Sequence, residues 1–162
     1  MPAATPAPRS ERSPAFVDDY LPALLAQASQ LISGEFHRIV LAQGFTVTEW
    51  RVLASLAGGR ALSTGELARV SVTKQPTVTR IIHRMVERGE VVRIDDENDR
   101  RVTLVRITAQ GSRLVAQLIA LARDHEAKVL EPFGAEQSAA LKRALQQIIA
   151  LHPADAGMPT EL

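Results

Sequence analysis

The polar residues between positions 73 and 84 have the types and the spacing of a surface that reads base pairs. Arginine and glutamine can pair bidentately with guanine and adenine edges, and a threonine methyl can meet the methyl group of thymine. If this segment is helical, at about 100° per residue, one polar face and its flanks gather Thr73, Lys74, Gln75, Pro76, Thr77, Thr79, Arg80, His83 and Arg84. Lys74 stands at the helix start, where it can neutralise phosphate. The alternative is an ordinary solvated helix face.

A second group of charges lies in the stretch RIDDENDRRVTLVRIT, residues 93–108. Its acidic and amide residues Asp95, Asp96, Glu97, Asn98 and Asp99 are followed by two adjacent arginines, Arg100 and Arg101. Residues 91–94 and 102–107 are rich in β-branched and aliphatic side chains, which predicts two short strands with the charges at the hairpin tip. Because apolar residues occupy both faces of this ribbon, we expect it to be partly covered.

The elements around residues 73–84 predict a helix-turn-helix. Ser63 and Glu66 have the spacing of a capping box, which starts a short helix. After a break at residues 70–72, Thr73 is the predicted cap of a second helix that ends at Gly89. The buried stripe of that helix is predicted to be Val78, Ile81, Ile82 and Met85. Two helices joined by so short a turn are compatible with docking in the major groove.

Longer helices are predicted on both sides of this unit. Apolar residues at three- and four-residue spacing mark an amphipathic helix over about residues 18–43, and a shorter helix follows before Gly58. Thr108 is the predicted cap of a long helix that Pro132 stops, and a last helix runs from about residue 135 to 152. The expected fold is mainly α, a winged helix-turn-helix with long N- and C-terminal dimerisation helices and a two-stranded β wing.

Length and composition favour one domain without disulfides. The 162 residues include no cysteine. We expect a disordered arm over residues 1–15, one domain over 16–152 and a loose tail over 153–162, with the winged helix-turn-helix at about 46–108. No signal-peptide core and no membrane-length apolar run is visible, so a cytoplasmic location is expected. Net charge is −1 over residues 1–59, +4 over 60–113 and −2 over 114–162, which suits a nucleic-acid face in the middle of the chain.

Two motifs resemble those of the MarR family of bacterial transcription regulators. The segment DRRVTLVRITAQG is similar to the family's wing signature through Asp99, Arg101, Ile107, Thr108 and Gly111. The segments ELA (residues 66–68) and PTVTRIIHRMVERGEVVR (residues 76–93) are similarly placed. The resemblance covers about residues 20–151. It implies a homodimer, interlocked through the first and the last two helices (about 18–43 and 108–152), that binds a near-palindromic operator in double-stranded DNA.

The resemblance also assigns roles at the wing tip. The Arg101 side chain is expected to enter the minor groove, with the Asp99 carboxylate orienting it, and Arg100 is expected to contact a phosphate. The sequence departs from the family pattern at Glu97 and Asn98, where a proline and a further basic residue often stand. The salt dependence of DNA binding is therefore expected to be shallower than in a relative with the extra base.

Family members commonly release their operator when a small molecule, often an aromatic carboxylate, binds between the dimerisation helices and the DNA-binding lobe. Such a site needs an apolar cleft and a cation. The candidates here are Phe36, His37, Arg38, Trp50 and Arg51. Trp50 is equally compatible with a packing role, and His37 and Arg38 with a plain helix flank.

Enzyme chemistry finds little support in the sequence. There is no nucleophile elbow and no phosphate-binding glycine loop, so we expect neither catalysis nor a cofactor. Asp124, His125 and Glu126 are possible metal ligands, but consecutive side chains diverge around a helix, so no metal site is expected. The remaining alternative is an effector-independent winged-helix module that compacts DNA or binds proteins, which a comparison of promoter with random DNA would distinguish.

Overall fold

The computed structural model describes residues 15–96 and 102–152. Apart from residue 15, the predicted N-terminal arm and C-terminal tail lie outside these ranges. The chain divides into two units, one up to Arg38 and one from Ile39 onward.

The first unit contains a short 3-10 helix, η1 (Phe16–Asp18), and most of helix α1 (Leu21–Ala42). Pro22 lies in the first turn of α1, where its missing N–H breaks no helical hydrogen bond. The Phe16 and Tyr20 rings stack with their centroids 4.8 Å apart. Several apolar side chains of α1 are exposed, among them Leu31 at 73% and Leu21 at 55%.

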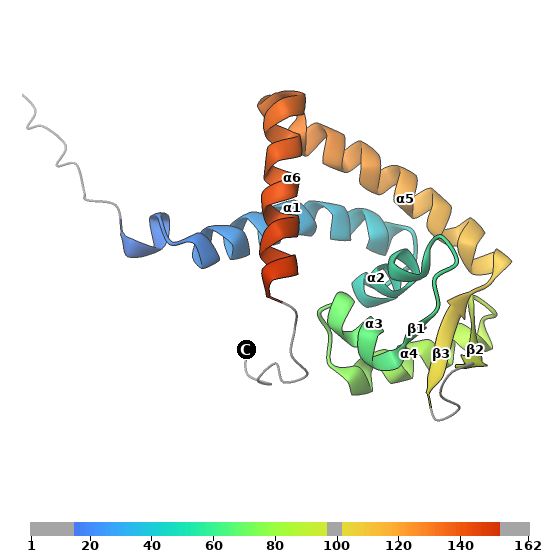
Figure 1. Ribbon diagram of the computed structural model, residues 1–162. Coiled ribbons are helices and arrows are strands. Elements are labelled where there is room, and N and C mark those ends of the chain that lie inside the picture. Colours follow the sequence, from blue (N-terminus) through green and yellow to red (C-terminus); the bar gives the residue numbers. More distant parts are fainter. Residues whose placement is uncertain (1–14, 97–101, 153–162) are drawn as a thin grey trace, which may run out of the picture. The chain divides into compact units, whose positions relative to one another are not determined.

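The second unit begins with a lobe of three helices and a small sheet (Figure 1). The helices are α2 (Val47–Leu56), α3 (Thr64–Val70) and α4 (Gln75–Glu87). Strands β2 (Val91–Asp95) and β3 (Thr103–Ile107) form the predicted ribbon, and β1 (Leu62–Ser63) adds a third strand beside β3 in the order β1-β3-β2. Sequence reasoning missed β1 because two residues are too short to show an alternating pattern.

Two capping boxes start helices in this lobe. The predicted one is confirmed: the Ser63 hydroxyl accepts from the Glu66 amide at 3.2 Å, and the Ser63 amide donates to the Glu66 carboxylate at 2.8 Å. Thr46 and Glu49 repeat this arrangement at the start of α2. The predicted cap at Thr73 is wrong. Lys74 occupies the cap position without a side-chain hydrogen bond, because Thr73 Oγ1 instead donates to the Ser71 carbonyl at 3.0 Å.

The core of the lobe lies between α2, α4 and the sheet. The predicted stripe of α4 is confirmed as buried, with Val78 and Met85 fully inaccessible and Ile81 at 5% exposure. Val52, Leu53 and Leu56 of α2 are also fully buried. These side chains form one continuous cluster with Val91 and Val105 of the sheet.

Two long helices follow the sheet. Helix α5 (Ala109–Leu130) starts at Thr108, whose hydroxyl accepts from the Gly111 amide at 3.0 Å, as predicted. After a 3-10 turn, η2 (Glu131–Phe133), helix α6 (Gly134–Leu151) packs only lightly, and none of its described residues is buried. On α5, Leu118 is buried, whereas Leu114, Leu121 and Val129 are half-buried.

Gly111, in the first turn of α5, lies against the backbone of Glu90 and the side chain of Ile107. A Cβ placed there would lie 2.1 Å from the Glu90 carbonyl oxygen and 2.8 Å from Ile107 Cγ1. We expect Gly111→Ala to lower the free energy of unfolding by about 2–3 kcal/mol, because backbone atoms must shift to accept the methyl group. Urea denaturation measures this. Gly65→Ala, in α3 where nothing lies within 4 Å of the added carbon, is the matched control and should change stability by no more than about 1 kcal/mol. Equal effects at the two positions would contradict the close approach.

Candidate DNA-binding surface

The turn between α3 and α4 is held by hydrogen bonds to both sides. Ser71 is buried, and its hydroxyl donates to the Leu67 carbonyl at 2.6 Å. Arg51 Nη1 on α2 donates to the Ser71 carbonyl at 3.1 Å. The Thr73 amide donates to the Ala68 carbonyl at 2.9 Å. The start of α4 is therefore tied to both α2 and α3.

Val72 carries the sharp reversal of this turn. Its φ of +50° lies in the left-handed region, which β-branched residues rarely adopt, and its side chain is 78% exposed. The exposed valine contributes little to the core, so neighbouring hydrogen bonds must hold the strained backbone. The turn thus fixes where α4 begins.

The polar face predicted for α4 is present and largely exposed. Exposed side chains are Lys74, Gln75, Pro76, Thr79, Arg80, His83 and Arg84, while Thr73 and Thr77 are half-buried. The hydroxyl groups of Thr73 and Thr79 already donate to the carbonyls of Ser71 and Gln75, each at 3.0 Å. His83 pairs with Glu87 at 3.4 Å. The groups left to point outward on this face are chiefly the amide of Gln75 and the cations of Lys74, Arg80 and Arg84.

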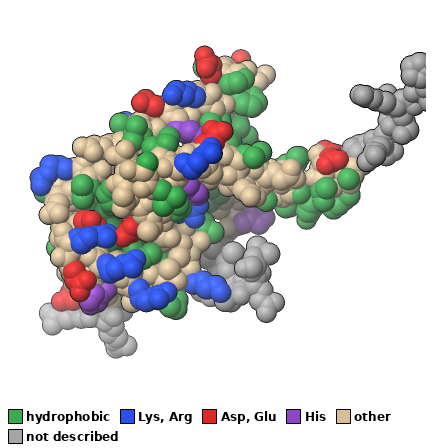
Figure 2. Space-filling model, turned by 180° about the vertical axis from the view of Figure 1, so that it is seen from behind, with side chains coloured by type: hydrophobic (Ala, Val, Ile, Leu, Met, Phe, Trp, Pro, Cys, Tyr) green, Lys and Arg blue, Asp and Glu red, His purple; other side chains and the backbone are tan. Residues whose placement is uncertain are grey.

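The wing carries further exposed cations. The register of β2 and β3 pairs Val92 with Arg106 and Asp95 with Thr103. Both Arg93 and Arg106 are exposed on these strands, and neither was assigned a role from the sequence. Figure 2 shows Lys and Arg side chains in a row across this lobe, with a few acidic side chains among them. Asp99, Arg100 and Arg101 lie outside the described residues, so their predicted roles remain proposals.

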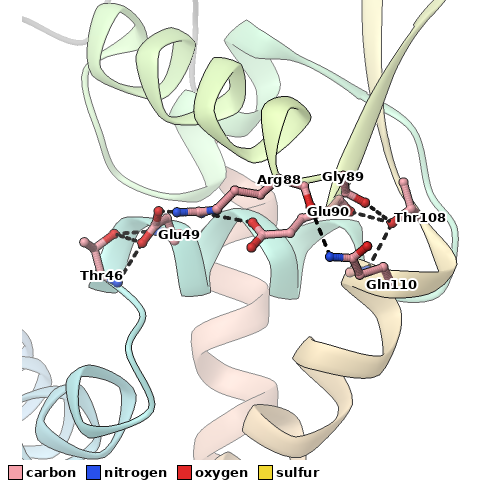
Figure 3. A network of polar contacts seen from close by, with 8 residues as sticks. Thr46, Glu49, Arg88, Gly89, Glu90, Thr108 and Gln110 are labelled. Carbon is pink, nitrogen blue, oxygen red and sulfur yellow. Dashed lines mark hydrogen bonds and ion pairs between the residues drawn. The ribbon is translucent and has the colours of Figure 1, made fainter.

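A polar network joins the C-terminal end of α4 to α2 (Figure 3). Arg88 Nη2 donates to Glu49 Oε1 at 2.7 Å and to Glu90 Oε2 at 3.0 Å. Both carboxylates are buried, with residue exposures of 4% for Glu49 and 6% for Glu90. The other oxygen of Glu49 accepts from the amide and hydroxyl of Thr46, each at 2.8 Å. One guanidinium therefore holds two buried carboxylates from different elements.

The same corner is tied to α5. Thr108 Oγ1 donates to the Gly89 carbonyl at 2.7 Å, and Gln110 Nε2 donates to the Arg88 carbonyl at 3.0 Å (Figure 3). Sequence reasoning did not assign this network. The Thr46–Glu49 spacing was a usable signal, but the contact between Glu49 and Arg88 spans 39 residues and has no local signature.

The candidate effector residues are distributed over both units. On α1, Phe36 is buried, His37 is half-buried and Arg38 is exposed. On α2, Trp50 is half-buried and packs against the core of the lobe, which supports its alternative role as a packing residue. Arg51 is half-buried and already engaged with Ser71.

Among residues 15–96 and 102–152, no cluster of three or more His, Cys, Asp or Glu side chains has the geometry to hold a metal ion. Glu126 instead accepts from Lys142 Nζ at 2.7 Å, which links α5 to α6. Over the same described parts of the chain, no helix combines the length and apolar character needed to cross a bilayer.

Comparisons with known proteins agree with this architecture. A MarR family model matches residues 43–102, from before α2 to the start of β3. The crystal structure of a MarR family transcriptional regulator from Silicibacter pomeroyi is 38% identical, with a TM-score of 0.74, over 85% of this chain and 98% of that one. The chain belongs to the MarR family.

Two further MarR family matches cover most of the chain. The homoprotocatechuate degradative operon repressor of Escherichia coli is 28% identical over 82% of this chain and 90% of that protein. The structure of NadR in complex with 4-hydroxyphenylacetate is 25% identical, with a TM-score of 0.73, over 89% of this chain and 97% of that one. The Silicibacter pomeroyi relative is a transcriptional regulator, and the Escherichia coli relative is an operon repressor.

The Glu49 carboxylate should make this MarR protein sensitive to acid. Burial by itself raises the pKa of Glu49, but hydrogen bonds from Thr46 and Arg88 outweigh it, so the pKa lies below its ordinary value of 4.5. A carboxyl with a depressed pKa stabilises the fold above pH 4.5, and this contribution is lost as pH falls through the folded-state pKa. We expect Glu49→Gln to flatten the decline of the unfolding free energy below pH 4.5, measured by urea titrations at several pH values. An unchanged slope in the variant would contradict the assignment.

Proposed function

We propose that this chain is a sequence-specific transcriptional regulator that binds double-stranded operator DNA as a homodimer. The observation that carries the proposal is the exposed polar face of α4, which stands opposite a fully buried apolar stripe and begins at a hydrogen-bonded turn. A helix presented in this way can enter the major groove with its first two turns facing base edges.

The proposed contacts follow from the chemistry of each side chain. Gln75 and Arg80 suit bidentate pairing with adenine and guanine, and Lys74 and Arg84 suit phosphate. Pro76, Thr77 and the methyl groups of Thr73 and Thr79 offer apolar surface to thymine. At the wing, Arg101 is proposed for the minor groove with Asp99 orienting it, and Arg100 for phosphate.

The proposed dimer is supported by the apolar surface of the terminal helices. Leu31 on α1 is 73% exposed and Ile149 on α6 is 70% exposed, and Leu141, Ile148 and Leu151 of α6 are exposed as well. So much exposed apolar surface is unusual for a monomer and is removed from water when two chains pack together. Two lobes held in this way can reach successive major grooves, which lie about 34 Å apart.

DNA selection tests the proposed function. From a pool of random duplexes, the protein should enrich a near-palindromic sequence bound by two chains, as counted by sedimentation of the complex. Arg80→Ala should change which sequence is enriched, at a loss of about 1–3 kcal/mol for the original site, because a base contact is lost. Arg101→Ala should weaken binding to all duplexes.

Three outcomes of this experiment would each overturn a different part of the proposal. No enrichment over random DNA would overturn specific recognition and favour an architectural DNA-binding module. One chain per duplex would overturn the dimer. The same proportional loss in both arginine variants on every duplex would overturn the division between base reading and minor-groove contact.

We propose in addition that a small aromatic carboxylate releases the protein from its operator. NadR was crystallised with 4-hydroxyphenylacetate, and the Escherichia coli relative is the repressor of an operon for breakdown of an aromatic acid. The candidate cations are Arg38, which is exposed, and Arg51, which already donates to the Ser71 carbonyl, and the other candidates are Phe36, His37 and Trp50. A coupling of about 1–3 kcal/mol would lower operator affinity roughly five- to 150-fold.

The release proposal is tested with 4-hydroxyphenylacetate and other aromatic acids. The effective acid should raise the melting temperature and lower affinity for the selected duplex, while its uncharged amide should do neither, because the amide lacks the carboxylate that a cation binds. Arg38→Met, which removes the exposed candidate cation and leaves the Arg51 contact to the turn in place, should weaken the response to the acid. If no acid in the panel changes either the melting temperature or DNA affinity, the release proposal fails while the DNA-binding proposal stands.

A further inference from the structure

Helix α4 is held at its two ends by different interactions, and the C-terminal end has no assigned role in DNA binding. We propose that Arg88 is a positioning residue for operator recognition: through Glu49 and Glu90 it fixes the direction in which α4 presents its polar face. This inference rests on the proposed DNA-binding function. It assigns operator specificity to a side chain that is 45% exposed but whose terminal nitrogen binds two buried carboxylates of the protein.

The geometry of the network supports this role. A single terminal nitrogen of Arg88 serves two carboxylates, at 2.7 Å to Glu49 on α2 and 3.0 Å to Glu90 just before β2. The guanidinium is planar and its N–H directions are fixed, so two partners restrain orientation more strongly than one. The last residues of α4, the N-terminal half of α2 and the entry to the wing are therefore held at one point.

Because α4 is long, a small tilt at Arg88 would move the residues proposed to contact DNA. Helix α4 has 13 residues and is about 20 Å long, so a tilt of about 3° at Arg88 would displace the opposite end by about 1 Å. Gln75 lies at that opposite end, and Arg80 lies about two turns from Arg88. Hydrogen bonds between a side chain and a base edge do not tolerate displacements of this size well.

Charge balance provides a way to separate positioning from stability. Arg88→Met leaves two buried carboxylates without their cation, which is strongly destabilising. Removing all three charges, in Glu49→Gln/Arg88→Met/Glu90→Gln, leaves no unpaired buried charge and should restore much of the lost stability. A network that only stabilised the fold would then be dispensable for DNA binding, whereas a positioning network would not.

The experiment measures affinity for the wild-type selected duplex and for random DNA, at a temperature where circular dichroism shows every variant folded. Arg88→Met and the triple variant should both lose about tenfold or more in the ratio of the two affinities, the size of one lost base contact, although the triple variant melts nearer to wild type. Arg88→Lys keeps the charge without the planar fork and should also lower the ratio. Arg123→Met, at an exposed residue of α5, is the control for the loss of one positive charge and should leave the ratio unchanged.

Three results would overturn the positioning role or the function on which it rests. A wild-type ratio in the triple variant or in Arg88→Lys would overturn the positioning role and leave the network as a stabilising contact only. If Arg123→Met lowered the ratio as much as Arg88→Met, the effect would be one of net charge and the proposal would fail. Failure of the wild-type protein to prefer any duplex would overturn the proposed function itself, which is a separate result.

Discussion

Burial of the apolar stripe of α4 is the interaction on which the rest of this structure depends. Val78, Ile81, Ile82 and Met85 pack into one cluster with α2 and the sheet. Because a helix has only one rotation that buries such a stripe, the same packing turns Arg80, Arg84 and their neighbours outward. The hydrophobic effect thus orients the polar face without any contribution from the polar side chains themselves.

Polar contacts at the edges of this core fix the two ends of α4, because hydrogen bonds are directional and apolar packing is not. The turn is fastened by Arg51 to the Ser71 carbonyl, and the far end of α4 by Arg88 to Glu49 and Glu90. Among the described residues, no buried side-chain nitrogen or oxygen is left without a partner. These satisfied contacts stabilise both ends of α4. Removing one member leaves its buried partners unpaired, so a single substitution there is costly.

The terminal helices α1 and α6 are less buried than the helices of the lobe. Helices α1 and α6 expose more apolar surface than the lobe does, and α6 buries none of its described residues. Their apolar periodicity predicted helices correctly, but it could not distinguish a partner within the chain from a partner in a second copy. Helix α5 is buried only in its first half, at Gly111, Val115 and Leu118, and its residues after Leu118 are half-buried or exposed.

The sequence by itself determined the elements and the polar face of α4, because helix caps, apolar spacing and glycine stops act over a few residues. The Ser63–Glu66 box, the Thr108 cap and the α4 stripe are of this kind. Only the tertiary structure decided that Thr73 serves the turn and not the helix cap, that Leu62 and Ser63 join the sheet, and that Arg88 binds Glu49 across 39 residues. The β1 pairing and the Arg88–Glu49 contact depend on groups that the packed core brings together from distant parts of the chain, which local spacing does not reveal. The Thr73 bond spans only two residues, but it depends on a turn that Arg51 of α2 helps to hold.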